Sequence, residues 1–240
     1  AGYAHSCAIL SSGTVQCWGY NDYGLGNGST TWSTTPVTVS DISDAVSIAA
    51  GFYYSCAVLS SGDVQCWGRK EGNGSPTDSP TPVTVDGIGD AVAINAGAAH
   101  NCSVLGSGTV QCWGNNDFGQ LGNGSTTSST TPVIVADLDD AVAVTGGLDH
   151  SCAVLSNGAV QCWGPNTFGN LGDGSTMDST TPVTVSGIVN AVAVSAGAAH
   201  SCAILNNGTV QCWGSNEQGQ LGNGQASGSS RAPGLPVYYQ

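Results

Sequence analysis

Charge is scarce in this chain of 240 residues, and positive charge is almost absent. Charged residues make up 8% of the sequence, with 3 basic residues against 16 acidic ones and a formal net charge of −13. Such a surface repels the phosphate backbone of nucleic acids and anionic membrane surfaces. We therefore expect no nucleic-acid partner.

Long apolar runs and helical periodicity are missing as well. No apolar stretch reaches the length of a membrane span, so membrane insertion is not expected. No segment repeats its apolar residues at helical spacing, which predicts an all-β fold. The sequence begins at Ala1 without a signal peptide, as a mature, processed or excised chain would.

Cysteine and glycine are plentiful, with 10 and 36 residues, and both recur within one phrase. The phrase HSCAILSSGTVQCWG, at His5–Gly19, returns in similar form from Tyr54, His100, His150 and His200. It has two β-forming runs joined by a three-residue connection that ends in Gly, as in a β-hairpin. The two cysteines then lie directly across the ladder, within bonding reach.

This geometry predicts one disulfide within each hairpin. The predicted pairs are Cys7–Cys17, Cys56–Cys66, Cys102–Cys112, Cys152–Cys162 and Cys202–Cys212. Bonds between adjacent repeats, such as Cys17 to Cys56, stay open because sequence does not fix connectivity. A zinc site is disfavoured, since no CxxC or HxxxH spacing occurs, and we expect no metal and no cofactor.

Paired cysteines without a metal pattern place the protein in an oxidising compartment, secreted or at the cell surface. Five asparagines fit the N-glycosylation rule: Asn27, Asn73, Asn101, Asn123 and Asn207. Asn-Gly is also a favoured turn pair, which is the competing interpretation of most of these positions.

The hairpins belong to a tandem array with a period of about 50 residues, typical of a closed repeat fold. Each unit adds a Pro-Val strand such as PVTV and a small-residue strand such as AVAV, which gives four strands. We predict a single β-propeller domain over residues 1–240, with five antiparallel blades and one disulfide in each. The approximate repeats are 2–50, 51–96, 97–146, 147–196 and 197–240.

The two ends leave such a ring one strand short. Only Ala1-Gly2 precedes the first hairpin where an AVAV strand is expected, and Pro236–Gln240 replaces the last PVTV. Closure by a blade that shares strands from both termini is the favoured interpretation. Two others stay open: a longer protein with more blades, and an edge that accepts a strand from a neighbouring copy.

The motif G-x-x-H-S-x-A-(I/V)-L-x-x-G-x-V-x-x-W-G, followed by N-x-x-G-Q-L-G and a Pro-Val strand, resembles the regulator of chromosome condensation repeat. The resemblance covers essentially the whole chain and implies a β-propeller of four-stranded blades. The family includes a nuclear exchange factor for a small GTPase, a plant UV-B photoreceptor and a secreted bacterial inhibitor of β-lactamases. It implies a scaffold rather than one function.

Residues repeated in every unit are expected to be structural. The tryptophans after the second cysteines are interpreted as blade packing in the core: Trp18, Trp67, Trp113, Trp163 and Trp213. The repeated histidines His5, His100, His150 and His200 are expected to form hydrogen bonds within or between blades, and Tyr54 takes the equivalent place in the second unit.

No catalytic residue is predicted, and the protein is expected not to be an enzyme. Asp149 is the one acid next to a repeated histidine, but adjacent strand residues point to opposite faces. Hydrolases need paired carboxylates in a pocket, whereas acids such as Asp137, Asp139 and Asp140 fall in loops.

Positions that break the repeat are the candidates for binding. They gather in the first two units: Tyr3, Tyr20, Trp32, Phe52, Tyr53, Arg69 and Lys70. By repeat equivalence Tyr3, Phe52, Tyr53, Leu148 and Asp149 should share one face. Aromatic residues beside a basic pair are typical of a recognition patch, although packing against a neighbouring segment is the alternative.

The function that fits best is an extracellular or cell-surface interaction module, non-enzymatic, that binds a protein or glycan through propeller loops. One alternative is a structural subunit of a surface layer or extracellular filament, assembled through the incomplete terminal blade. Another is a secreted enzyme inhibitor of the propeller type.

Overall fold

The computed structural model describes residues 1–70 and 72–234, and all its regular elements there are β-strands. Strands of the first two sheets are β1 (His5–Ile9), β2 (Val15–Gly19), β3 (Ser33–Thr38), β4 (Ala45–Ala50), β5 (Tyr54–Leu59), β6 (Val64–Gly68) and β7 (Ser79–Thr84). The third sheet holds β8 (Ala91–Ala96), β9 (His100–Leu105), β10 (Val110–Gly114) and β11 (Ser129–Ile134). The last two sheets hold β12 (Ala141–Gly146), β13 (Ser151–Leu155), β14 (Val160–Gly164), β15 (Ser179–Thr184), β16 (Ala191–Ala196), β17 (His200–Leu205), β18 (Val210–Ser215) and β19 (Ser229–Ser230).

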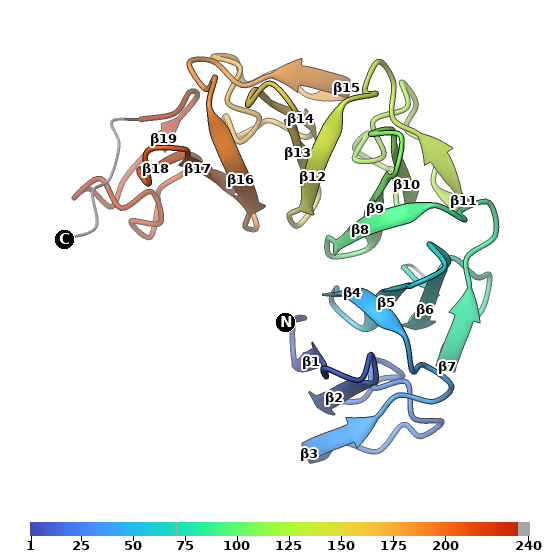
Figure 1. Ribbon diagram of the computed structural model, residues 1–240. Helices are drawn as coiled ribbons and strands as arrows, with labels where there is room; N and C mark the ends of the chain where they lie inside the picture. The colour runs from blue at the N-terminus through green and yellow to red at the C-terminus, as the bar shows by residue number, and fades with distance from the viewer. Residues whose placement is uncertain (71, 235–240) are drawn as a thin grey trace.

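These strands form five antiparallel sheets that stand as blades in an arc around a common centre (Figure 1). In the four-stranded sheets, β4, β8, β12 and β16 lie innermost and are followed outward by the two hairpin strands and an edge strand. Small residues suit the inner strands, where neighbouring blades converge. Proline suits the outer edge strand because it cannot donate a ladder hydrogen bond.

The arc formed by the described residues is open (Figure 1), and the ring closure favoured from the sequence is not formed among them. The first sheet contains β1, β2 and β3 alone, as the absent AVAV strand predicts, and takes no strand from the other end of the described chain. In the last sheet the edge is β19, which pairs with β18. The predicted Pro236–Gln240 strand lies outside the described residues.

The hairpin geometry follows the prediction. In the first blade Cys7 lies opposite Cys17, and Gly13 takes a φ of 85° at the end of the connection. All five predicted disulfides are formed within their hairpins, and none joins adjacent repeats. The bond therefore fixes the register of each hairpin.

Removing one such bond tests its contribution to stability. Replacing both Cys152 and Cys162 by alanine is expected to lower the free energy of unfolding by about 2–3 kcal/mol, since a short loop loses its closure constraint. Denaturant unfolding monitored by circular dichroism measures the change. An unaltered midpoint would show that the hairpin is already fixed in the unfolded chain.

Consecutive blades are joined by the repeated tryptophans. Trp67, Trp163 and Trp213 are buried, and each indole Nε1 donates to a loop carbonyl of the preceding blade. The donor–acceptor distances are 2.8, 2.8 and 2.9 Å. The apolar clusters confirm the predicted packing role for four of the five tryptophans, because each cluster combines one blade with a tryptophan of the next. Trp18 is half-buried and belongs to none of these clusters.

Three of the four repeated histidines, His5, His100 and His150, also join blades, as predicted. His5 Nε2 lies 2.8 Å from Ser55 Oγ in the second blade, and His150 Nε2 lies 2.8 Å from Ser201 Oγ in the fifth. Tyr54 replaces histidine by reaching further: its hydroxyl donates to the carbonyl of Gly97 at 3.0 Å. These side chains are thus committed to holding the blades together.

Candidate functional site

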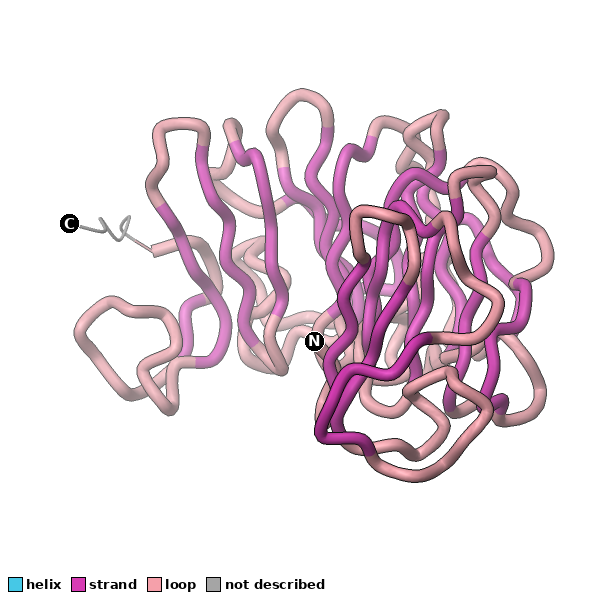
Figure 2. The backbone as a smooth tube through the Cα atoms, turned by 60° about the horizontal axis from the view of Figure 1, so that its bottom comes forward, coloured by secondary structure: helices cyan, strands magenta, loops and turns pink. Residues whose placement is uncertain are grey.

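Loops gather at both ends of the blades (Figure 2), and one end carries most of the exposed aromatic side chains. The residues after β4, β8, β12 and β16 lie at this end, together with those after β2, β6, β10 and β14. We call it the aromatic end. Tyr3, Phe52, Tyr53, Leu148 and Asp149 all lie there, so the predicted shared face is confirmed.

The five aromatic residues that break the repeat form one continuous cluster. We call this cluster the aromatic patch: Tyr3, Tyr20, Trp32, Phe52 and Tyr53. Its ring centroids are 5.2 Å apart for Tyr20–Trp32, 6.1 Å for Tyr20–Tyr53, 6.1 Å for Tyr3–Tyr53 and 5.0 Å for Tyr3–Phe52. Side chains from two blades thus lie side by side; they come from the segment before β1, the loop between β2 and β3, and the loop between β4 and β5.

The aromatic patch faces solvent. Trp32 is 69% exposed and Tyr3 67%, whereas the four tryptophans between blades are buried. Rings at these centroid distances attract one another. An exposed, ordered group of rings is the kind of surface at which binding free energy concentrates in protein interfaces.

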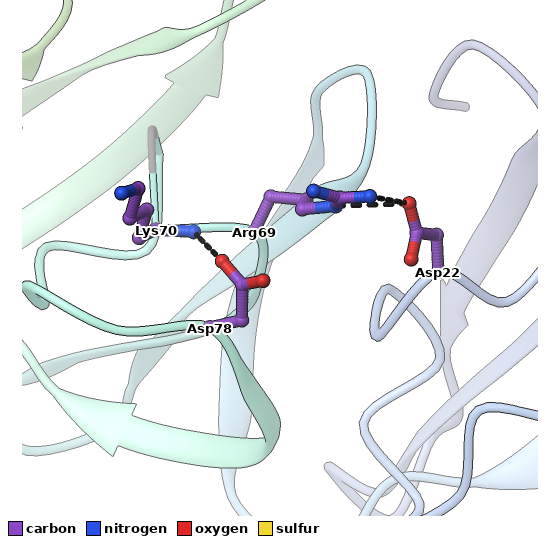
Figure 3. Close-up of polar contacts among 4 residues, drawn as sticks. All are labelled: Asp22, Arg69, Lys70 and Asp78. Carbon is purple, nitrogen blue, oxygen red and sulfur yellow. Dashed lines mark hydrogen bonds and ion pairs between the residues drawn. The ribbon is translucent and has the colours of Figure 1, made fainter.

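Arg69 lies beside the aromatic patch and is ion-paired. Its Nε donates to Asp22 Oδ2 at 2.8 Å, and its guanidinium Nη2 contacts the same oxygen (Figure 3). The pair joins the loop after β6 to the loop after β2, and so crosses from the second blade to the first. With Phe52 and Tyr53, Arg69 lines a hollow of about 300 Å³.

Lys70 belongs to a separate hollow. Its backbone N–H donates to Asp78 Oδ1 at 2.9 Å, and its side chain extends away from Arg69 (Figure 3). Lys70 lines a hollow of about 340 Å³ with Pro76 and Asn115. The structure therefore gathers the aromatic patch and Arg69 in one place and leaves the second predicted cation at its margin.

A central hollow opens at the same end, where the blades converge. It measures about 400 Å³ and is lined mainly by glycine and alanine that follow the inner strands. Tyr3 and Phe52 of the first two blades and Leu148 of the fourth also line it. The aromatic patch therefore runs from the central hollow outward to Trp32.

Sequence reasoning missed a further hollow on the third and fourth blades. It measures about 180 Å³ and is lined in part by Phe118, Leu148, Asp149, Pro165 and Phe168. The two phenylalanines lie at equivalent positions of the phrases NDFGQLG and NTFGNLG. Their regularity within the repeat concealed them, because only departures from the repeat were taken as candidates.

The polar residues of this end are not arranged as a metal centre. Within residues 1–70 and 72–234, no three His, Cys, Asp or Glu side chains come together as metal ligands would.

The same part of the chain contains no helix with the length and hydropathy of a membrane span.

The predicted glycosylation sites differ in accessibility. Asn73 and Asn101 are buried, and their amide nitrogens donate to the carbonyls of Gly68 and Gly72. A glycan has no room at either, so the prediction is wrong for these two. Asn27 and Asn123 are half-buried at the aromatic end, and Asn207 is exposed in the hairpin turn at the other end.

The exposure of Trp32 gives a direct check on the aromatic patch. Iodide quenching of tryptophan fluorescence is expected to act mainly on Trp32, because Trp67, Trp113, Trp163 and Trp213 are buried and Trp18 is half-buried. Trp32→Phe should therefore remove most of the quenchable emission and leave the rest nearly insensitive to iodide. Equal quenching of the variant would contradict this placement.

Antiparallel blades around a common centre, with hollows and exposed rings at one end of the blades, define a β-propeller that offers a surface for contact. The chain belongs to the RCC1-like domain family, whose model matches residues 1–236. No curated protein sequence is detectably similar to it.

Solved structures of proteins from yeast, human and a plant share this fold. Prp20p from Saccharomyces cerevisiae, described with binding to Gsp1p and histones, aligns with a TM-score of 0.87 at 22% identity over 99% of this chain and 62% of its own. Human WBSCR16 gives 0.83 at 21% identity, over 99% and 66%. The ectodomain of the Arabidopsis thaliana receptor kinase ACR4 gives 0.55 at 24% identity, over 89% and 61%. The chain thus spans about 61–66% of the length of these structures.

Proposed function

We propose that this protein is an extracellular or cell-surface interaction module, non-enzymatic, that binds a protein or glycan through the aromatic patch. One observation carries the proposal: five aromatic side chains from two blades contact one another at one end of the propeller, with Trp32 and Tyr3 largely in solvent. Aromatic rings exposed to water raise the free energy of the protein, and a partner that covers them lowers it.

Four further observations support the extracellular location and the protein partner. Five disulfides favour an oxidising compartment, and the similarity to a receptor-kinase ectodomain agrees with it. The described binding of Prp20p to Gsp1p and histones supports a protein partner. The net charge of −13 disfavours a nucleic acid.

The test is a selection for ligands followed by loss of binding. Native protein is used to select from a displayed peptide library and from a glycan array. The variant Tyr3→Ser/Trp32→Ser is expected to lose roughly 30-fold in affinity for the selected ligand, as at interface hot spots. Val189→Ser is the matched control, because Val189 is 74% exposed and precedes β16, at the opposite end of the blades. Undiminished binding by the double variant would overturn the proposal.

A second candidate is a subunit of a surface layer or filament. It is favoured by the first sheet, in which β1 has a strand partner on one side alone among the described residues. An unpaired edge can accept a strand from another chain. Light scattering over a range of concentrations separates the two: constant mass supports the binding module, and growth into long assemblies supports the subunit.

A further inference from the structure

The hollow on the third and fourth blades combines apolar walls with one acid. We call it the Asp149 hollow. Phe118 follows β10 and is 51% exposed, and Phe168 follows β14 and is 38% exposed. Leu148, Pro165, Ala198 and Ala199 complete the apolar lining, and His150, Thr167 and Asn170 add polar groups. Asp149 is the one carboxylate among the lining residues.

The charge of Asp149 is not balanced from within the described chain. Asp149 forms no ion pair with another described residue. The ion pair found among the described residues joins Arg69 and Asp22 in the first two blades. Its neighbour His150 offers no positive charge, because burial lowers the pKa of that imidazole to about 3 and its Nε2 is occupied by Ser201. Burial, and next the nearby carboxylate of Asp117, raise the pKa of Asp149.

The size of the hollow limits what it can accept. A volume of about 180 Å³ is smaller than typical cofactor or drug sites, which begin at roughly 300 Å³. One long side chain fits the hollow better than a separate small molecule. Lysine and arginine cover apolar surface with their stems while their charged heads seek a carboxylate or the face of a ring.

We propose that the Asp149 hollow binds one basic side chain, lysine or arginine, of a protein partner. The stem packs on Leu148 and Pro165, and the cation meets Asp149 between the rings of Phe118 and Phe168. A neutral side chain would leave the carboxylate desolvated and unpaired, and an acidic one would be repelled.

The Asp149 hollow shares no residue with the aromatic patch, but the central hollow connects the two surfaces. Leu148 lines both the Asp149 hollow and the central hollow, and Tyr3 and Phe52 also line the central hollow. A partner segment bound on the aromatic patch can therefore reach the Asp149 hollow over the central hollow. A partner with a basic residue also complements a chain of net charge −13.

The experiment is a titration of the ¹⁵N-labelled full chain with two probes that differ in charge. N-acetyl-lysine methylamide is compared with its neutral analogue, N-acetyl-norleucine methylamide. We expect the lysine probe to shift the amide signals of Leu148 and Asp149, and to bind at least roughly five-fold more tightly than the neutral probe.

Two variants that each replace one aspartate by asparagine test whether the preference for the cation depends on Asp149. Asp149→Asn is expected to lose most of the preference for the cation. Asp139→Asn, at the opposite end of β12, should keep it. Thermal unfolding of each variant establishes that it is folded. Phe168→Leu should weaken the lysine probe about two-fold through loss of the ring face.

Each of the remaining outcomes overturns the proposal. Equal binding of the two probes would mean an apolar hollow without a role for the carboxylate. Equal losses in Asp149→Asn and Asp139→Asn would mean attraction by the net charge alone. No shift at Leu148 or Asp149 at millimolar probe would mean that this hollow takes no basic side chain.

Discussion

Acidification from pH 7 to pH 4 is expected to remove most of the stability of this protein, because three buried histidines stay neutral in the folded state. Burial lowers the pKa of His5 and His100 to about 4 and that of His150 to about 3, from an ordinary value of 6.5. Each is held between blades, where a charged imidazole would be desolvated.

Whether stability rises or falls with pH depends on which state, folded or unfolded, binds more protons. The folded pKa lies below the unfolded one, so stability is fully present above pH 6.5 and is lost as the pH falls toward 4. Each histidine contributes a slope of up to about 1.4 kcal/mol per pH unit, so three give about 4 kcal/mol per unit near pH 5. The raised pKa of Asp149 acts in the opposite direction and offsets a small part of this.

Denaturant unfolding at a series of pH values measures the slope. His150→Gln, which retains a donor nitrogen and does not titrate, should reduce the slope by about a third. A free energy of unfolding that stays constant between pH 7 and pH 5 would show that these histidines are not held neutral at the blade interfaces.

Replacing Trp163 by alanine is expected to lower the free energy of unfolding by about 3–5 kcal/mol. The indole is buried against the core of the third blade, and its Nε1 donates to the carbonyl of Gln120 at 2.8 Å. Removal leaves a cavity between two blades and an unsatisfied carbonyl.

The chain supplies its own controls for this prediction. Trp18 occupies the same place in the first repeat but is half-buried, so Trp18→Ala should cost clearly less. Trp32→Ala should change stability by less than about 1 kcal/mol, since the side chain is largely exposed. Similar losses for Trp18 and Trp163 would contradict the role assigned to the interface between blades.

Local features were predictable from the sequence because the same pattern of residues occurs in all five repeats. The spacing within each hairpin places Cys7 opposite Cys17, and repeat equivalence places Tyr3, Phe52 and Tyr53 at one end of the blades. Both follow from strand geometry alone, without knowledge of how blades meet.

The particular residues that meet non-repeating side chains across two blades were not predictable in this way. Asn101 fits a glycosylation rule, but its position on β9 buries it against the second blade, where it bonds to Gly72. The partner of Arg69 is Asp22, 47 residues away in the first blade. Closure of the ring likewise depends on where the ends of the arc lie, which no local pattern encodes.

The most direct test of the proposed recognition surface is the response of the indole N–H signals when the selected ligand binds. The six tryptophans give six such signals in a ¹H–¹⁵N spectrum. The signal of Trp32 is predicted to shift or broaden, while those of Trp67, Trp113, Trp163 and Trp213 stay in place. Movement of the buried set with Trp32 unchanged would contradict binding at the aromatic patch.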